Sequence, residues 1–527
     1  MKKLLSISLL LCAASTYAQD TYMNEQMLNN SDDVIGTSRY VGMGGALGAL
    51  GADMSVISWN PAGIGLYRKG DVALTFGGVW NKNRIKEENR GTGTFDQIGF
   101  VYNFRTESEV CPYVNFAINY QKKKTFYSNF YADSDGSNPL YISQMDQLGE
   151  LASYGYDTNW NLAGLAVDNN ALSSYTDDEG KLKYFNKYYG DYNTYTHHSE
   201  GSLRGWDFNV STNILDRAFL GLTFGVDNIE YNAWTNYFEA SHFIDDNDVK
   251  HLGDYSIWND YKVTGYGFNF KLGGIVLPFE DNSFRVGFAV ESPTWYKLKS
   301  SVWMNYANET QDPIVISKSV ESYLPFNIQS PWKFRASMGS TVSNKLAWDV
   351  DYEYADYKNM TQRYPYNDSF GGERDIDMND HMYSNLKGVH TIRAGVEVRP
   401  VAPLAFRLGY NFSTSPYEKN ANLDQIGINS AAMDYITRTN YMITKPTHIL
   451  SLGMGYRWKK FYFDMAYKIR HQKADFYAFD DSFLIDPNSD FSISNSDWLQ
   501  NNHVEPLAPV PVDLTRHSIT CTLGFKF

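Results

Sequence analysis

Hydrophobic and polar positions alternate along fourteen segments of the chain between Asp71 and Phe527. In one of them Val114, Phe116 and Ile118 share one face, while polar or small residues occupy the positions between them. A period of two predicts β-strands with one face against apolar surroundings. Most segments are close to the ~9–11 residues with which a tilted strand crosses a bilayer. They cover residues 71–80, 95–105, 112–122, 204–214, 217–228, 263–277, 283–292, 332–341, 346–357, 389–399, 403–412, 447–458, 460–470 and 515–527.

The connections between these segments alternate between short and long. The short ones are 106–111, 215–216, 278–282, 342–345, 400–402 and Lys459, and the long ones are 123–203, 229–262, 293–331, 358–388, 413–446 and 471–514. A soluble sandwich has no reason to produce this order, whereas outer-membrane barrels combine brief periplasmic turns with large external loops. We therefore predict an all-β fold, a 14-stranded antiparallel transmembrane β-barrel over residues 71–527, with long extracellular loops.

The two faces of the predicted strands differ in chemistry. Aromatic residues expected in the interfacial girdles are Trp80, Trp295, Trp332, Tyr354, Trp458 and Phe527. The opposite faces of the eighth and ninth strands carry five charged residues that we expect to form ion pairs in the lumen: Lys333, Arg335, Asp349, Asp351 and Glu353. A turn centred near Ser343 predicts that Lys333 pairs with Glu353 and that Arg335 pairs with Asp351. These pairs are expected to be structural.

The first eighteen residues have the pattern of a secretory signal peptide. Lys2 and Lys3 precede an apolar stretch over residues 4–14, and Thr16-Tyr17-Ala18 forms a small-residue cleavage site. Together with the barrel, this signal predicts export to the outer membrane of a Gram-negative bacterium.

Composition excludes several other classes of protein. A net charge of −14 without a basic stripe argues against nucleic acid as a partner. Beyond the signal, Cys111 and Cys521 are the only cysteines, which excludes a disulfide-rich scaffold and leaves open whether they pair. The chain has 40 tyrosines, 31 phenylalanines and 12 tryptophans, which suits a surface that is half wet and half in lipid. The scattered histidines and the lack of a nucleophile motif predict neither an enzyme nor a metal site, and no cofactor is expected.

Residues 19–70 precede every predicted strand and are the candidate for a hatch that plugs the lumen. Five glycines are expected to let its backbone pack closely against the wall: Gly42, Gly44, Gly45, Gly48 and Gly51. Five further residues form a compact turn that is expected to hold the hatch during gating: Asn60, Pro61, Ala62, Gly63 and Gly65. The alternative is that this turn only connects the hatch to the first strand.

The stretch MGGALGALGADMSVISWNPAGIGLY, with its Asn-Pro-Ala motif at Asn60 to Ala62, resembles the N-terminal hatch of the FadL family of outer-membrane transporters, and most of all its longer, tyrosine-rich branch. The resemblance implies transport of long-chain fatty acids or other hydrophobic molecules. It also implies that the ligand enters through an external groove, displaces part of the hatch and leaves through a wall opening at the third strand. That strand, residues 112–122, has no interior glycine to mark a kink, so the exit route and the ligand stay open.

The longest connection, residues 123–203, predicts two helices. Leu140, Met145, Leu148 and Leu151 fit the first, and Leu162, Leu165 and Ala166 fit the second. These helices either form an apolar surface that captures the ligand or merely cap the barrel. At the C-terminus, Phe525 and Phe527 end an alternating strand in the form recognised by the outer-membrane assembly machinery.

The expected partners are therefore a hydrophobic small molecule, outer-membrane lipids and the assembly machinery. The competing interpretation is a barrel without transport that serves as a secretion-system partner, an adhesin or a receptor for haem or another ligand. The lumen discriminates between them, since a transporter predicts an apolar pocket against the hatch and a scaffold predicts a filled, polar interior.

Overall fold

The computed structural model describes residues 33–527 apart from 83–90, 135–141, 154–160, 281–282, 311–314, 344, 365–369, 420, 422–436 and 482–506. The predicted signal peptide, residues 19–32 of the predicted hatch and Leu140 lie outside the described residues. Among the residues that are described, no helix is both long and apolar enough to cross a membrane.

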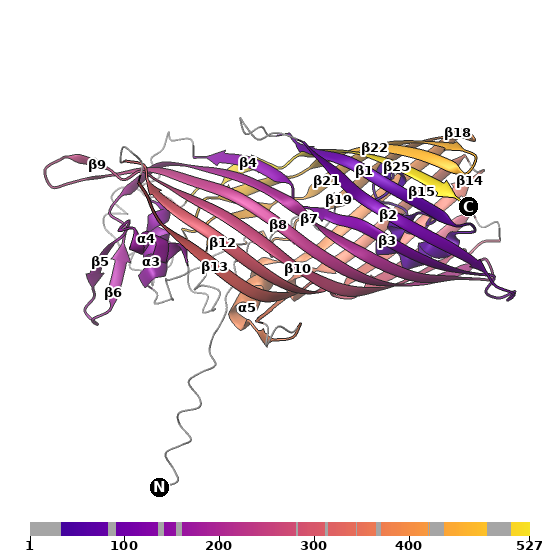
Figure 1. Ribbon diagram of the computed structural model, residues 1–527, viewed down its shortest axis with the longest axis horizontal. Coiled ribbons are helices and arrows are strands. Elements are labelled where there is room, and N and C mark those ends of the chain that lie inside the picture. Colours follow the sequence, from indigo (N-terminus) through magenta and orange to yellow (C-terminus); the bar gives the residue numbers. More distant parts are fainter. Residues whose placement is uncertain are drawn as a thin grey trace, which may run out of the picture.

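The chain forms a closed antiparallel barrel of fourteen strands, which confirms the predicted fold class (Figure 1). Its strands are β1 (Asp71–Asn81), β2 (Thr92–Arg105), β3 (Tyr113–Thr125), β7 (Tyr189–Ile214), β8 (Ala218–Ile244), β10 (Tyr255–Val276), β11 (Phe284–Glu291), β12 (Trp295–Asn308), β13 (Val315–Gln329), β14 (Lys333–Val342), β15 (Leu346–Asp356), β18 (Gly388–Val401), β19 (Leu404–Ser413), β21 (Thr447–Trp458), β22 (Phe461–His471) and β25 (Arg516–Lys526). Pairing of β1 with β25 closes the ring.

Three neighbouring strands of the barrel are interrupted, and the ninth is divided into β15 and β16 (Thr361–Tyr364) by the helix η4 (Tyr357–Asn359). The seventh consists of β11 and β12, separated by Ser292-Pro293-Thr294, and the eighth consists of β13 and β14, separated by Ser330-Pro331-Trp332. A proline has no N–H group for the ladder, so it ends a strand that must pair on both sides. The third strand behaves differently, because β3 pairs with β2 and β7 without a break from Tyr113 to Gln121. It shows no wall opening there.

The faces of the strands are inverted relative to a soluble protein. Outward-facing apolar side chains such as Phe116, Leu222 and Leu408 are exposed, whereas inward-facing polar side chains such as Asn119 and Asn209 are buried. This arrangement places an apolar belt around the outside and polar side chains toward the lumen, as in a membrane-spanning barrel.

On one side the barrel extends far beyond the length that a bilayer requires. β7, β8 and β10 contain 26, 27 and 22 residues, and β7 already begins at Tyr189, inside the segment predicted as a loop. The extension carries the helices α3 (Gln144–Ser153) and α4 (Leu162–Asp168), which lie where the two helices were predicted. We call this end the loop end.

Shorter elements complete the chain, mostly around the loop end. The strands are β4 (Ser128–Asp133), β5 (Ser173–Thr176), β6 (Leu182–Phe185), β9 (Lys250–Leu252), β16 (Thr361–Tyr364), β17 (Glu373–Arg374), β20 (Tyr441–Thr444), β23 (Lys473–Tyr477) and β24 (Val510–Asp513). The helices are η4 (Tyr357–Asn359) and α5 (Ile376–Asn385).

Candidate functional site: the lumen and its cavity

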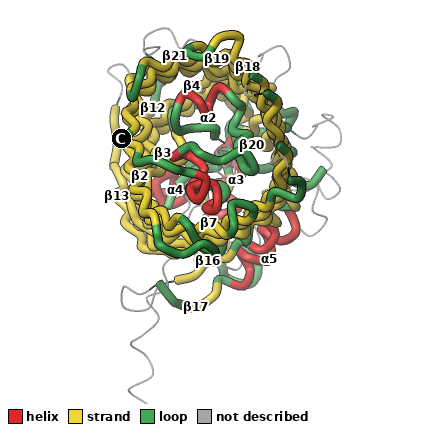
Figure 2. Tube along the Cα trace, turned by 90° about the vertical axis from the view of Figure 1, so that its right-hand side faces the viewer, coloured by secondary structure: helices red, strands yellow, loops and turns green. Residues whose placement is uncertain are grey.

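Residues 33–70, which we call the inner segment, lie inside the ring of strands (Figure 2). The segment contains three short helices, α2 (Ser38–Gly42), η1 (Met54–Ser58) and η2 (Pro61–Leu66). Each begins at a residue whose side chain accepts a hydrogen bond from the first turn: Thr37, Asp53 and Asn60. These caps explain how a segment so rich in glycine keeps a defined shape.

Glycines of the inner segment meet glycines of the wall. The Cα atoms of Gly42 and Gly453 are so close that a Cβ on either would lie 3.0 Å from the other residue. Gly44 has φ +66°, which favours glycine. A Cβ added to Gly409 of β19 would lie 2.0 Å from the amide nitrogen of Gly44. The backbone of the segment is thus in direct contact with the wall. Gly45 and Gly51, the other predicted packing glycines with positive φ, contact Arg393 and Gly63.

Two wall carboxylates hold the middle of the inner segment. Asp351 accepts a hydrogen bond from the Gly48 amide at 3.2 Å, and Asp349 accepts from the Leu50 amide at 2.8 Å. Asp349 also accepts from the Ala49 amide at 3.1 Å. Both aspartates were predicted to belong to lumen ion pairs. The structure instead directs them to backbone N–H groups of the inner segment.

The predicted register of β14 and β15 is wrong by two residues. Arg335 pairs with Glu353 rather than Asp351, and Lys333 lies opposite Ala355 rather than Glu353. The Arg335 guanidinium is 2.5 Å from Glu353 and 2.6 Å from Glu291 on β11. The turn is centred one residue later than predicted, since Val342 pairs with Leu346, and a shift of one in the centre moves every pair by two.

Trp59 of the inner segment is held between two wall arginines. Its ring lies under the guanidinium of Arg335 at 4.4 Å and under that of Arg393 at 3.5 Å. Arg335 also donates to the Trp59 carbonyl at 3.0 Å, and Arg393 donates to the Tyr40 hydroxyl at 2.7 Å. Such stacking in a buried site is worth ~2 kcal/mol or more. Neither Trp59 nor Arg393 stood out in the sequence, because single residues without a motif carry no signal.

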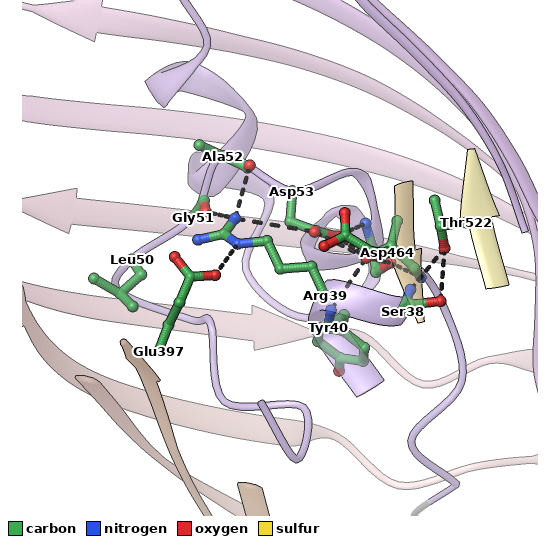
Figure 3. Close-up of polar contacts among 12 residues, drawn as sticks. Ser38, Arg39, Tyr40, Leu50, Gly51, Ala52, Asp53, Glu397, Asp464 and Thr522 are labelled. Carbon is green, nitrogen blue, oxygen red and sulfur yellow. Dashed lines mark hydrogen bonds and ion pairs between the residues drawn. The ribbon is translucent and has the colours of Figure 1, made fainter. Parts of the chain in front are cut away.

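A second set of buried charges attaches the start of the inner segment (Figure 3). Arg39 of α2 lies 3.3 Å from Glu397 of β18 and donates to the Ala52 carbonyl at 3.0 Å. The amide of Ser38 donates to Thr522 of β25 at 2.7 Å. These contacts connect α2 to two strands of the C-terminal part of the barrel, β18 and β25.

Asp33 is the first described residue and is fully enclosed. Its carboxylate lies 2.7 Å from Arg516 and 3.1 Å from Lys468. Burial acts to raise the pKa of Asp33, but the two cations outweigh it and hold the pKa below its usual range. The inner segment is therefore anchored by a charged carboxylate at its start.

The predicted gating turn lies at the other end of the inner segment. The Asn60 side chain accepts from the Ala62 amide and donates to the Gly48 carbonyl at 2.9 Å, so it links two parts of the segment. The Pro61 carbonyl accepts from Asn209 and Ser211 of β7. The Gly63 carbonyl accepts from the Ala52 amide, and Gly65 lies against the Thr212 carbonyl and Phe219.

A cavity remains beside the inner segment, with about 950 Å³ of space free of protein atoms, part of it continuous with solvent. Its aromatic and aliphatic lining includes Tyr40, Trp59, Tyr296, Ile328, Tyr357 and Met360. Its charged lining consists of the cations Lys123, Lys124, Lys271, Lys333, Arg335 and Arg393, and the anions Asp33, Asp227, Glu291 and Glu353. The cavity thus combines apolar surface with an excess of positive charge.

The remaining predicted site residues lie apart from this cavity. Met145, Leu148 and Leu151 are buried in the apolar cluster beneath α3, so they present no open surface to a ligand. Phe527 stacks on Phe100 at 5.9 Å and on Phe525 at 6.3 Å, at the closure of the barrel. Cys111 and Cys521 are free thiols. Among the described residues, no cluster of three or more potential metal ligands is present.

Comparison with known proteins places the fold. No family model and no curated protein matches the sequence. A Pseudomonas aeruginosa FadL homologue superposes with a TM-score of 0.53 at 12% identity, covering 94% of this chain and 100% of that one. The fold is FadL-like. The toluene transporter TodX of Pseudomonas putida matches 94% of this chain and 98% of its own length, at 9% identity with a TM-score of 0.48. The toluene transporter TbuX of Ralstonia pickettii matches 94% of this chain and 99% of its own length, at 11% identity with a TM-score of 0.45.

This FadL-like barrel is of the outer-membrane type. The identities are far too low to transfer a ligand or a mechanism, so the contacts inside the lumen must carry any argument about function.

Proposed function

We propose that this protein transports a hydrophobic small molecule, such as a long-chain fatty acid, across the outer membrane, and that the inner segment acts as the hatch that gates the passage. The observation that carries the proposal is the cavity, which Tyr40 and Trp59 of the inner segment line together with aromatic, aliphatic and charged residues of the wall. A ligand in this cavity competes directly with contacts that keep the segment in place. The FadL-like fold supports the same function.

Attachment of the inner segment suits a gate better than a permanent filling. Much of the attachment consists of hydrogen bonds and ion pairs to wall residues, which water can replace when the segment moves. Where glycine meets glycine, no side chains interlock. The side chains that must leave their wall partners are Trp59, Arg39 and Asp33, and a ligand that opens the gate must replace their contacts.

A reversible disulfide between the inner segment and the wall tests the gate. A Cβ on Gly48 would lie 3.0 Å from the Ser337 Cβ and 2.5 Å from Asp351 Oδ1. The segment must therefore move slightly away from the wall, toward the ~3.8 Å between Cβ atoms of a disulfide. Gly48→Cys and Ser337→Cys are introduced together in a background with Cys111→Ser and Cys521→Ser. Uptake of a fluorescent long-chain fatty acid is expected to stop on oxidation and to return on reduction.

Each single-cysteine variant is the matched control and should respond to neither treatment. Equal uptake by the oxidised and reduced double variant would show that the inner segment does not gate. An absence of uptake by the parent protein, compared with cells lacking it, would contradict transport of this class of ligand.

A further inference from the structure

The extended part of the barrel carries a groove on its outer face, away from the lumen. The neighbouring strands β7, β8, β10 and β12 supply its lining (Figure 1). Their ladder aligns Trp234, Asp260 and Trp303 in one row, and the residues beside these three point the other way. The groove contains about 860 Å³ of space free of protein atoms, part of it continuous with solvent. It shares no lining residue with the luminal cavity.

Two tryptophans flank this groove. Trp234 and Trp303 belong to strands that are separated by β10, so their Cα atoms are roughly 10 Å apart, which leaves room for a sugar ring. Trp303 is 41% exposed, whereas its neighbour Val302 is buried in the apolar cluster of the interior. The face of an indole ring is negative, so it attracts the weakly positive C–H groups on the face of a sugar.

Polar side chains complete the groove. Asp260 lies between the two tryptophans, and Glu200 and Asn232 line the groove beside them. In the part of the chain that the structure describes, no hydrogen bond or ion pair involves the carboxylates of Asp260 and Glu200. Carboxylates and amides are suited to bind the hydroxyl groups of a sugar. The combination of aromatic faces with available polar groups therefore favours a saccharide over a purely apolar ligand.

A layer of lysines lies between the groove and the apolar belt. From the groove toward the belt, the outward-facing pairs of β10 and β12 are Asp260 with Trp303, Lys262 with Ser301, Thr264 with Lys299, Tyr266 with Lys297, and Phe268 with Trp295. One carboxylate, that of Glu230, faces the same layer opposite Thr264. Three lysines against one glutamate leave an excess of positive charge, which attracts anionic groups such as phosphates.

The spacing of these layers matches the outer leaflet of an outer membrane. Tyr266 is 47% exposed and marks the aromatic edge of the belt, and Asp260 lies six positions beyond it on β10. At ~3.3 Å per residue and a strand tilt of roughly 40°, the groove lies about 15 Å above that edge. In lipopolysaccharide, phosphates lie at the surface of the acyl layer and the core sugars follow above them. The belt, the lysine layer and the groove present the matching chemistry in the same order.

We propose that this outer face binds lipopolysaccharide of the surrounding leaflet, with its phosphates at Lys262 and Lys299 and a core sugar between Trp234 and Trp303. The lysine layer separates the groove from the belt, and this continuity with the membrane is why we assign the sugar to a lipid rather than to a soluble glycan. The site uses only outward-facing residues, so it is independent of the proposed transport function. Bound lipopolysaccharide braces the parts of β7, β8 and β10 that extend beyond the belt.

Binding of purified lipopolysaccharides to the refolded barrel in detergent tests the site, with dissociation constants measured by microscale thermophoresis. The groove variant combines Trp234→Ala with Trp303→Ala, and the lysine variant combines Lys262→Gln with Lys299→Gln. Rough lipopolysaccharide, which ends in a complete core, should bind to each variant on the order of tenfold more weakly than to the parent. Deep-rough lipopolysaccharide, truncated to its innermost sugars, should bind more weakly to the lysine variant alone.

Two matched controls should bind both lipopolysaccharides like the parent. Trp234→Phe with Trp303→Phe keeps both aromatic faces. Lys181→Gln with Lys473→Gln makes the same change of charge at other exposed positions. An equal loss of binding in this second control would overturn the site, as would unchanged binding by the groove and lysine variants. Free core oligosaccharide that bound as tightly as rough lipopolysaccharide would overturn the assignment to a membrane lipid in favour of a soluble glycan.

Heat-modifiable migration verifies that each variant folds. If the groove variant does not fold, Asp260→Ala replaces it, because loss of this acceptor should weaken binding of rough but not of deep-rough lipopolysaccharide. Uptake of a fluorescent fatty acid should be the same in all folded variants. The lipopolysaccharide site and the proposed transport function can therefore fail independently of each other.

Discussion

At the scale of single residues, the closest contacts in the lumen join backbone to backbone. Gly409 and Gly44 leave no room for a methyl group between them, whereas Gly274, on the outward face of β10, has its nearest neighbour 3.6 Å from an added Cβ. The two wall glycines therefore offer a matched pair for substitution.

Gly409→Ala is expected to displace the inner segment, because an added Cβ would lie 2.0 Å from the Gly44 amide nitrogen. Overpacking of this kind costs about 1–3 kcal/mol, which weakens the seated state of the segment. Single-channel conductance of the variant in planar bilayers should rise above that of the parent. Gly274→Ala should leave conductance unchanged, and equal behaviour of the two variants would contradict the close packing of the segment.

The buried charges permit a test of the corrected register. Arg335→Glu places a third carboxylate beside Glu291 and Glu353, and breaking a buried pair in this way costs about 3–5 kcal/mol. Adding Glu353→Arg should recover part of this loss in urea unfolding of the refolded barrel. Adding Asp351→Arg, the partner in the register predicted from the sequence, should recover less. Equal recovery by both would refute the observed pairing.

At the scale of elements, the alternating pattern located the strands within the belt because each has an apolar outward face there. It missed the upper parts of β7, β8 and β10, and it placed β12 and β13 inside a predicted long connection, residues 293–331. The upper outward faces of β7, β8 and β10 show no such contrast. The register of β14 and β15 could not be predicted for a related reason. A change in the centre of their turn shifts the pairing without changing which residues face inward. The helices α3 and α4 were predictable from their apolar spacing, but that spacing did not tell a buried face from a ligand surface.

The helix α3 carries a buried acid that makes the loop end sensitive to pH. Burial raises the pKa of Asp146 to about 7, and the nearby Glu239 acts in the same direction. A carboxylic acid whose pKa is raised by folding favours the folded state when it is protonated. Its contribution to the stability of the folded state is fully present below its ordinary pKa of 3.8 and is lost as the pH rises to about 7.

We therefore expect the loop that carries α3 to be more resistant to proteolysis at pH 5 than at pH 8. Asp146→Asn should lose part of this pH dependence, since an amide keeps the acceptor for the Ser143 amide without a charge. The rest should come from Glu239, which accepts from the Gln144 amide and whose pKa burial also raises to about 7. Measurement of cleavage rates with a protease active at both pH values checks this. A pH dependence that persists undiminished in the variant would place its origin elsewhere.

At the scale of the whole molecule, the fourteen-stranded closure could be predicted because the short and long connections alternate along the entire chain. The contents of the lumen could not, since they depend on pairs of residues hundreds of positions apart. The glycines and the Asn-Pro-Ala turn marked the inner segment as unusual, but no pattern of residues indicated that Asp349 and Asp351 bind its backbone. The strand breaks at Pro293 and Pro331 were likewise hidden inside a predicted long loop, residues 293–331.

Deleting Phe527 is expected to reduce the amount of folded barrel in the outer membrane. The ring stacks on Phe100 and covers Gly70, where the first strand begins, and it is also the proposed contact for the assembly machinery. Phe527→Tyr keeps the aromatic ring and should behave like the parent. The measurement is the fraction that migrates as a heat-modifiable band, and a normal fraction in the deletion would contradict the prediction.

The contacts at the start of the inner segment bear on the order of folding events. Asp33 and Ser38 bind Arg516 and Thr522 of the last strand, nearly the full length of the chain away. Contacts of such long range form late, because the intervening chain must first be brought into place. The inner segment is synthesised before the last strand, so it becomes fixed only when that strand is in place. A barrel that closed around an empty lumen would lack these bonds. Filling the lumen and sealing the cylinder are then one cooperative step.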